Sequence, residues 1–190
     1  NTNCLAIYTI VPRTLTVQST PVSGVAIIGV NGGTTTYTSV LDDNSAVSMT
    51  APQMVNIGGG DYRFVRWTRN GAPEADGALS LSFAIDQDTT CVAVYEPVYA
   101  LNVQSTPFAG VAIGGTPSGT TNYTRWVADG ATVNVTAPAN ADDGLGTDAV
   151  FVQWTYNATP VGTPSVGSPN VEFTMTETAT LIAVYSIVPR

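Results

Sequence analysis

The chain has 190 residues, of which 44% are hydrophobic and 11% charged, and its net charge is −8. It contains neither histidine nor lysine, so a Ser-His-Asp triad, a histidine-ligated metal and a Schiff-base lysine are all excluded. We therefore expect a protein that is not an enzyme; the negative charge argues against nucleic acid as a partner, and the short apolar runs argue against membrane insertion.

Seven strands are predicted after a short opening segment, residues 1–13. Turn residues (Gly, Pro, Asn and Asp) separate seven β-prone stretches, at residues 14–19, 24–30, 34–41, 46–51, 62–68, 78–85 and 90–96. Apolar residues alternate with polar ones at Leu15/Val17, Val47/Met49 and Val65/Trp67, as in strands with one buried face. Seven strands in so short a span predict an all-β, immunoglobulin-like sandwich, without the Cys…Trp…Cys spacing of antibody domains.

The same module then occurs a second time. Residues 15–21 (Leu-Thr-Val-Gln-Ser-Thr-Pro) recur almost unchanged at 101–107, and Phe64-x-x-Trp67 recurs as Phe151-x-x-Trp154. We therefore predict two tandem seven-stranded immunoglobulin-like β-sandwiches, over 14–98 and 99–190. No Gly/Ser-rich linker separates them, so we expect the modules to stack end to end.

The opening segment, residues 1–13, is an extra copy of the last strand of this module. Its final residues, Ile10-Val-Pro-Arg13, are identical to Ile187-Val-Pro-Arg190. We predict that this orphan strand completes a preceding module of a longer continuous array or, alternatively, inserts into a neighbouring subunit by β-strand addition. Copies of the chain itself, head to tail, or adjacent repeats of a longer chain are thus the expected partners, through an assembly strand made of Cys4, Leu5, Ala6, Ile7, Tyr8 and Ile10.

Two motifs resemble those of known surface repeats. The Val-x-Ser-Thr-Pro-x-x-Gly-Val-x-Ile opening is similar to that of PEGA-type modules of bacteria and archaea. The closing motifs, Phe151-x-x-Trp154, Phe173-Thr-Met175 and Ala183-Val-Tyr185, resemble divergent internalin-type B-repeats. The resemblance implies small β-domains strung in arrays on cell-surface or secreted proteins, and it carries no catalytic residues.

The tryptophans and cysteines can each be interpreted as core residues or as surface residues. Trp67 and Trp154 occupy equivalent positions and are predicted to lie in the two cores. Cys4 and Cys91 occupy the slot of Leu181, so we expect both to be unpaired, apolar residues. Arg125 and Trp126 replace Ser39 and Val40 of the first copy. They are either half-buried strand residues or a contact with the neighbouring domain, or else a cation–π surface or a stacking surface for a saccharide.

Acidic loops and glycosylation triplets are the remaining candidate sites. Asp142, Asp143 and Asp148 crowd a Gly-rich loop that is either a calcium site or simply solvated, and calcium is the one cofactor considered. Paired carboxylates also serve glycosidases, but these lie on turns without an evident cleft. Asn122, Asn134 and Asn157 begin N-glycosylation triplets, which matter only in an organism that glycosylates asparagine.

These observations favour an extracellular or cell-surface structural repeat: a spacer that forms a rod, stalk or filament by head-to-tail stacking of β-sandwiches. The alternative is a carbohydrate-binding or adhesive module that uses the Arg125–Trp126 face. The two differ in where the copies should diverge, because a spacer varies over its whole surface whereas a binder concentrates its differences at one patch.

Overall fold

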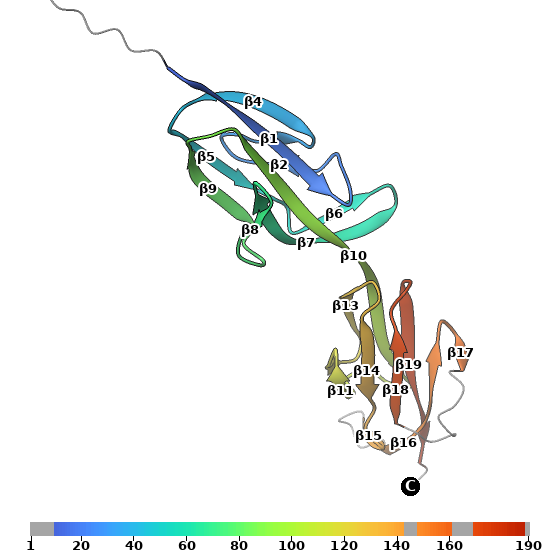
Figure 1. The fold of residues 1–190 in the computed structure, drawn as a ribbon. Helices are drawn as coiled ribbons and strands as arrows, with labels where there is room; N and C mark the ends of the chain where they lie inside the picture. The colour runs from blue at the N-terminus through green and yellow to red at the C-terminus, as the bar shows by residue number, and fades with distance from the viewer. Residues whose placement is uncertain (1–9, 143–147, 161–168, 189–190) are drawn as a thin grey trace, which may run out of the picture. The chain divides into compact units, whose positions relative to one another are not determined.

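The computed structural model describes residues 10–142, 148–160 and 169–188, and within these ranges the chain is all-β, with several sheets and no helix. Nowhere in them is there a helix with the length and hydropathy needed to cross a bilayer. The chain divides into two compact units, unit 1 (Asn1–Pro97) and unit 2 (Val98–Arg190), and each is described by itself (Figure 1).

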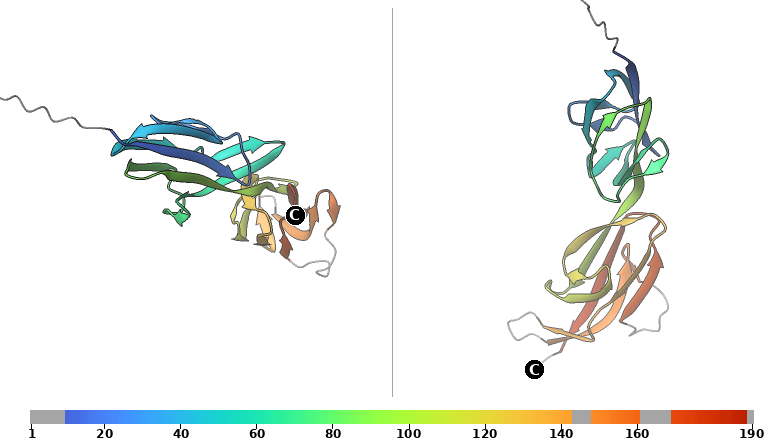
Figure 2. Two further views of the ribbon diagram at one scale, coloured as in Figure 1. Left: turned by 45° about the horizontal axis from the view of Figure 1, so that its top comes forward. Right: turned by 60° about the vertical axis from the view of Figure 1, so that its left-hand side comes forward.

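The larger sheet of unit 1 is built around its first and last strands. β1 (Pro12–Thr20) pairs in parallel with the first part of β10 (Thr89–Thr106), with Leu15 opposite Thr89 and Val17 opposite Cys91. Both views of Figure 2 show these two strands, dark blue and green, side by side. β4 (Tyr37–Asp42) pairs antiparallel with the other side of β1, and β7 (Gly60–Arg69) pairs with β10.

Short strands complete unit 1. β6 (Met54–Ile57) and β8 (Ala72–Pro73) form hairpins with the two ends of β7. β5 (Ser45–Thr50) and β9 (Ser80–Ile85) form a separate antiparallel pair, and β2 (Ala26–Ile27) pairs with β3 (Gly33–Thr34). An isolated bridge between Ile28 and Thr50 joins the β2 segment to β5.

Unit 2 repeats this arrangement. The last part of β10 pairs in parallel with β19 (Ala179–Ile187) and antiparallel with β13 (Tyr123–Ala128), while β16 (Asp148–Tyr156) joins β19, β15 (Asn140–Asp142) and β17 (Thr159–Pro160). The other strands form the order β12–β11–β14–β18, with bounds Gly119–Thr120, Ala112–Thr116, Thr132–Thr136 and Asn170–Thr174.

Each unit encloses a hydrophobic core of its own, to which strands of more than one sheet contribute. The core of unit 1 includes Leu15, Val17, Val47, Met49, Trp67 and Cys91. The equivalent core of unit 2 includes Leu101, Val103, Val133, Val135, Trp154 and Leu181. Burying such side chains contributes about 1.5–3 kcal/mol each, which is what holds a small β-domain together.

The Phe-x-x-Trp motif needs an irregular strand. Side chains three residues apart on a regular strand face opposite sides of the sheet, yet Phe151 and Trp154 are both buried. The pairing of β16 with β19 shifts register between Phe151 and Gln153, so one additional residue bulges out and both aromatic rings face the core. In unit 1 Phe64 is likewise buried with Trp67, whereas Val65, predicted on the buried face, is only half-buried.

Several predicted strands have different bounds. The strand expected at 24–30 is reduced to β2, and that expected at 34–41 is divided into β3 and β4. β6 and β8 were not predicted; each closes a hairpin through a two-residue turn, Gly58-Gly59 or Asn70-Gly71, whose residues all have positive φ. The strands expected before and after Pro97 are one continuous strand, β10.

Pro97 lies within β10 without disturbing the two ladders on either side of it. The pairing with β1 uses Thr89–Val94, and the pairing with β13 uses Val98–Val103. Pro97 belongs to neither register, so its missing N–H leaves no gap in either ladder. One uninterrupted strand therefore ends the first unit and begins the second.

Candidate functional site

Two polar residues that recur in both copies, Ser19 and Thr35 in unit 1, stabilise a turn by hydrogen bonds. Val25 N–H donates to Thr35 Oγ1 (3.0 Å), and Thr35 Oγ1 lies 2.6 Å from Ser19 Oγ. Ser19 Oγ also contacts the Val22 carbonyl oxygen, to which only its own proton can be donated. Thr35 must then donate to Ser19, which gives a directed chain from Val25 N–H through both hydroxyls to Val22 C=O.

Unit 2 contains the same hydroxyl chain. Val111 N–H donates to Thr121 Oγ1 (3.0 Å), Thr121 contacts Ser105, and Ser105 donates to the Phe108 carbonyl oxygen. Thr35 and Thr121 are both about 95% buried, so their hydroxyls need these partners. The repeated Ser-Thr-Pro motif and the later threonine thus have a structural purpose in each unit.

The repeated aromatic residues have equally structural partners. Trp67 Nε1–H donates to the Leu79 carbonyl oxygen and Trp154 Nε1–H to that of Pro169, both at 2.9 Å. The hydroxyl of Tyr95 donates to the Pro52 carbonyl oxygen; its counterpart, Tyr185, donates to that of Pro138. Burial raises the pKa of Tyr95 and of Tyr185 to about 12. The predicted core position of both tryptophans agrees with their burial.

Cys91 is a free cysteine with no exposed surface, in the core slot that Leu181 fills in unit 2. Burial is the main reason that the pKa of its thiol rises to about 11. Such a thiol is inert as a nucleophile at neutral pH. The other predicted cysteine, Cys4, lies outside the described residues.

Of the predicted assembly strand, Leu5, Ala6, Ile7 and Tyr8, like Cys4, lie outside the described residues. Ile10 is described and 65% exposed, and Val11 after it accepts a hydrogen bond from Asp43 N–H (2.9 Å). Pro12 and Arg13, predicted to belong to this segment, are part of β1, where they pair with Asp42 and Leu41.

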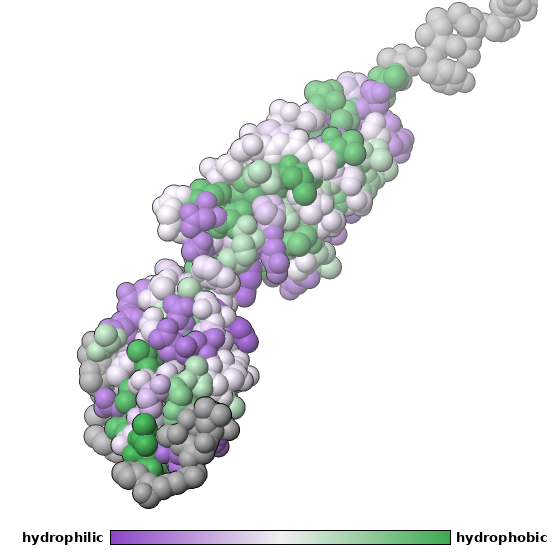
Figure 3. Space-filling model, turned by 180° about the vertical axis from the view of Figure 1, so that it is seen from behind, coloured by the Kyte–Doolittle hydropathy of each residue, from purple (hydrophilic) through white to green (hydrophobic). Residues whose placement is uncertain are grey.

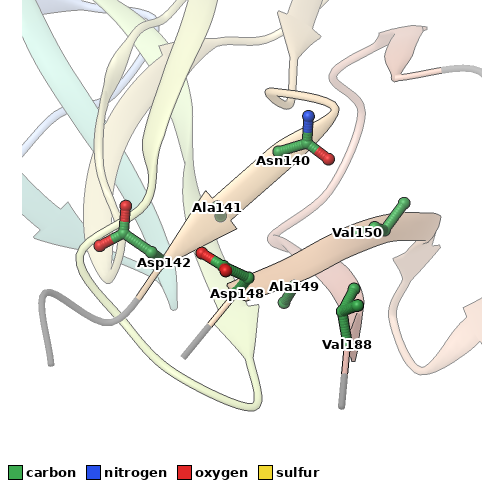
Figure 4. A pocket seen from close by; sticks show the side chains of 7 residues that line it. All are labelled: Asn140, Ala141, Asp142, Asp148, Ala149, Val150 and Val188. Atoms are coloured by element: carbon green, nitrogen blue, oxygen red, sulfur yellow. The ribbon is translucent and has the colours of Figure 1, made fainter. Parts of the chain in front are cut away.

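The predicted calcium loop starts and ends on two paired strands (Figure 4). Asp142 of β15 and Asp148 of β16 lie directly opposite each other. They line an open pocket of about 370 Å³ together with Asn140, Ala141, Ala149, Val150 and Val188. Asp143 lies outside the described residues, and the described residues contain no group of three His, Cys, Asp or Glu side chains placed to hold a metal ion. Calcium binding therefore stays a prediction.

Arg125 and Trp126 lie on β13, at the edge of the larger sheet of unit 2. The Trp126 side chain is on the outer row and 42% exposed. The Arg125 guanidinium lies 5.0 Å from the centre of the Tyr123 ring and donates to the Thr124 carbonyl oxygen. Each of the other arginines in the described ranges contacts a carboxylate: Arg13 with Asp43, Arg63 with Glu96, Arg66 with Asp76 and Arg69 with Glu74.

The three glycosylation triplets occupy ordinary surface positions. Asn157 is in a tight turn with positive φ; its Oδ1 accepts from Thr180 N–H (2.8 Å), as Asn70 Oδ1 accepts from Thr90 N–H in unit 1. Asn134 on β14 donates to Glu172, and the exposed Asn122 accepts from Ser105 N–H. Asn157 thus has a structural partner, which the triplet alone does not reveal.

One further pocket, of about 320 Å³, lies beside the hairpin of β7 and β8 and was not predicted. Arg69 forms part of its wall, 5.0 Å from the centre of the Phe83 ring and paired with Glu74, and Asp86 and Gln87 line it as well. In unit 2 the same place is filled by an edge-to-face contact of Tyr156 with Phe173. A cation–aromatic contact in unit 1 thus corresponds to an aromatic pair in unit 2.

Apolar side chains on the surface are scattered. The face in Figure 3 shows them in small separate groups among polar residues. Described apolar residues with high exposure include Ile28 and Val30 in the β2–β3 connection and Val40 on β4, at 66%, 87% and 72%. Single exposed apolar residues are normal, but a run of them on a sheet edge has consequences for association.

Comparison with known proteins gives a distant likeness. No family model matches the chain, and no curated protein matches it. A solved structure, the C-terminal fragment of pilus adhesin SpaC from Lactobacillus rhamnosus GG, aligns over 94% of this chain and 99% of its own at 12% identity, with a TM-score of 0.27. At that score the likeness carries no argument about function. The similarity to PEGA-type and internalin-type repeats therefore rests on the motif residues.

Proposed function

We propose that the chain is an extracellular, non-enzymatic spacer made of tandem immunoglobulin-like β-sandwiches, which forms a rod, stalk or filament by head-to-tail stacking. Copies of the same module, in the same polypeptide or in neighbouring subunits, are its partners in this proposal. The cell surface or the extracellular space is its proposed location.

Strand β10 carries this proposal. It is both the last strand of unit 1 and the first strand of unit 2, and it pairs in parallel with β1 in one unit and with β19 in the other. A module whose last strand becomes the first strand of the next can be repeated without limit and without a linker. A strand shared by successive modules is what we expect of a continuous array.

The nature of the repeated contacts supports the same proposal. Recurring residues with polar partners include Ser19/Ser105, Thr35/Thr121, Tyr95/Tyr185, Trp67/Trp154 and Asn70/Asn157, and in each of these pairs the bonds go to main-chain groups or to one another. They stabilise turns and cores. What the two copies share is thus what a fold needs, which favours a structural role over catalysis.

Electron microscopy of the purified native material tests the proposal. We expect elongated particles or filaments, and discrete compact particles alone would refute it. A denaturing gel then separates its two forms, because subunits run at the 19.7 kDa of this chain whereas a continuous array runs much higher.

Where the subunits prove to be separate, substitution within the assembly strand gives a second test. Ile10→Asp should abolish filaments, whereas Ile28→Asp, a change at an equally exposed apolar residue outside that strand, should not. Equal behaviour of the two variants would contradict strand-mediated assembly.

A second candidate function is carbohydrate binding by the Arg125–Trp126 face. One observation favours it: unit 2 alone presents an exposed indole beside an arginine that contacts no carboxylate among the described residues. Titration of polysaccharides against tryptophan fluorescence would test it. Trp126→Val installs the residue of unit 1 and should abolish binding, while a quenching response unchanged by that substitution would remove the candidate.

A further inference from the structure

The two units end their larger sheets differently. Within the described residues, β4 pairs only with β1 and β13 only with β10, so each is an edge strand with one unpaired side. The strands are equivalent in the repeat. An edge strand is a template for a further strand unless something blocks it, and a charge on the core-facing row is one of the usual blocks.

Unit 2 has such a block and unit 1 does not. On β13 the core-facing row is Tyr123, Arg125 and Val127, of which the first and last pack against the core. On β4 the same row is Tyr37, Ser39 and Leu41, with Tyr37 and Leu41 packed against the core. A serine in unit 1 therefore replaces the arginine, and β4 has no charge before Asp42.

The free backbone groups of β4 can be assigned from its bonded side. Asp43 N–H donates to the Val11 carbonyl oxygen, toward β1. Because backbone groups alternate in direction along an antiparallel strand, Ser39 and Leu41 also face β1, and the N–H and C=O groups of Thr38 and Val40 face away from it. Val40 is 72% exposed, so its surroundings leave room for a partner.

We propose that β4 is a docking edge for β4 of a second copy of this chain, in an antiparallel dimer with its twofold axis at Ser39. This register places Thr38 opposite Val40 of the partner, and each of these two pairs exchanges both N–H···O bonds, because their backbone groups are the free ones. The outer faces then join a valine to a threonine, a favourable cross-strand pair.

Electrostatic repulsion between two β4 strands is weak in spite of the net charge of −8. In the proposed register the two Asp42 residues lie at opposite ends of the ladder, about 20 Å apart at the usual rise of a strand. That separation is about two and a half times the screening length of about 8 Å in physiological salt, so their repulsion is weak. Asp43 is already paired with Arg13 at 2.7 Å. On β13 the same register would place two Arg125 side chains directly opposite each other.

The dimer is lateral and closed, so it is independent of the proposed head-to-tail array. Its test is sedimentation velocity of the 190-residue chain between about 1 and 500 µM, with variants that exchange the two edges. Ser39→Arg installs the residue of unit 2, and Val40→Lys adds a charge at a 72% exposed position that cannot disturb the core. Each should weaken dimerisation by about tenfold or more: in Ser39→Arg the two arginines lie directly opposite each other, and in Val40→Lys the two lysines are diagonal neighbours and the Val–Thr pairs are lost.

The reciprocal change is the sharpest variant. Arg125→Ser should remove the block on β13 and strengthen association, whereas a saccharide-binding role of Arg125 predicts no such gain. Thermal unfolding verifies that every variant is folded. A wild-type chain that stays monomeric at the highest concentration would overturn the proposal, as would a dimer that both Ser39→Arg and Val40→Lys leave intact.

Hydrogen exchange locates the contact. In the dimer the amides of Thr38 and Val40 should be protected, and in Val40→Lys both the Thr38 and the residue-40 amides should exchange faster. The amides of Ser39 and Leu41 face β1 and should be protected in both proteins. Exchange at Thr38 and Val40 that does not change with concentration would also overturn the proposal.

Discussion

Replacement of Thr35 by valine should destabilise unit 1 markedly although the two side chains have nearly the same shape. The substitution removes two bonds: Val25 N–H loses its acceptor, and Ser19 loses its donor. Val25 is 1% exposed, so water cannot replace the acceptor. An orphaned buried N–H costs about 1–3 kcal/mol and a lost neutral bond about 1 kcal/mol, so we expect a loss of about 2–3 kcal/mol after the gain from burying a methyl group.

Ser19→Ala is the matched comparison. It also breaks the hydroxyl chain, and it leaves both the Thr35 hydroxyl and the Val22 carbonyl without a partner; but Ser19 and Val22 are half-buried, so water can enter where the serine hydroxyl stood and replace it. We therefore expect a smaller loss, of about 1 kcal/mol. Thr35→Val should cost more than Ser19→Ala because the chain of hydrogen bonds starts at the buried N–H of Val25 and ends at the solvated carbonyl of Val22.

Urea unfolding provides the measurement. For a unit of this size, a loss of about 2–3 kcal/mol lowers the midpoint by about 2 M. The fluorescence of Trp67 reports on unit 1 in a background in which Trp126 is replaced by valine and Trp154 by phenylalanine. Thr121→Val should shift the unfolding of unit 2 by a similar amount, because the same chain of bonds is present there. A loss below about 0.5 kcal/mol for Thr35→Val, or a larger loss for Ser19→Ala, would refute the reasoning.

Three further predictions concern calcium, alkaline pH and the two cysteines. If the acidic loop 142–148 binds calcium, the melting temperature should be higher in millimolar Ca²⁺ than in excess EDTA, and equal values would remove the idea. Burial raises the pKa of Tyr95 and Tyr185 from 10.0 to about 12 and that of Cys91 from 9.0 to about 11. Their contribution to stability should therefore be fully present below about pH 9 and be lost from there to about pH 12, and a flat alkaline profile in urea titrations would contradict this. Mass spectrometry of the unreduced, denatured chain should find two free thiols, and a bond between Cys4 and Cys91 would show that the equivalence with Leu181 misleads.

The sequence predicts the all-β class, the separate repeats of core residues and the core position of the tryptophans, because these depend on periodicity and on comparison of the two copies. The alternation at Leu15/Val17 and Val47/Met49 agrees with their burial. The division into immunoglobulin-like sandwiches remains part of the proposal.

The errors have local causes. Val65 was placed on the buried face because a period of two was extended through a position where the equivalent strand of unit 2 bulges. The turns Gly58-Gly59 and Asn70-Gly71 are typical hairpin signals, but the strands that they join, β6 and β8, are too short to show alternation. The strand predicted at 90–96 was ended too early, because sequence alone does not reveal that the strand continues through Pro97 while its neighbour changes from β1 to β13.

The candidate sites were harder to predict than the core. Arg125 was recognised as a difference between the copies, but its place on a core-facing row at a sheet edge depends on pairing with β10, which is a long-range feature. Neither the hydroxyl chain of Ser19 and Thr35 nor the structural bond of Asn157 has a signature in the spacing of residues.

The parallel pairing of first and last strands also determines how each unit bears a mechanical load. Tension along the chain enters unit 1 at the start of β1 and leaves it through β10, and these strands are parallel neighbours over Leu15–Thr20 and Thr89–Val94. The two pulls therefore act at opposite ends of one ladder, and its hydrogen bonds are sheared together rather than peeled apart one by one. β10 and β19 place unit 2 under the same geometry, so a pulling force meets the strongest orientation of the ladder in both units.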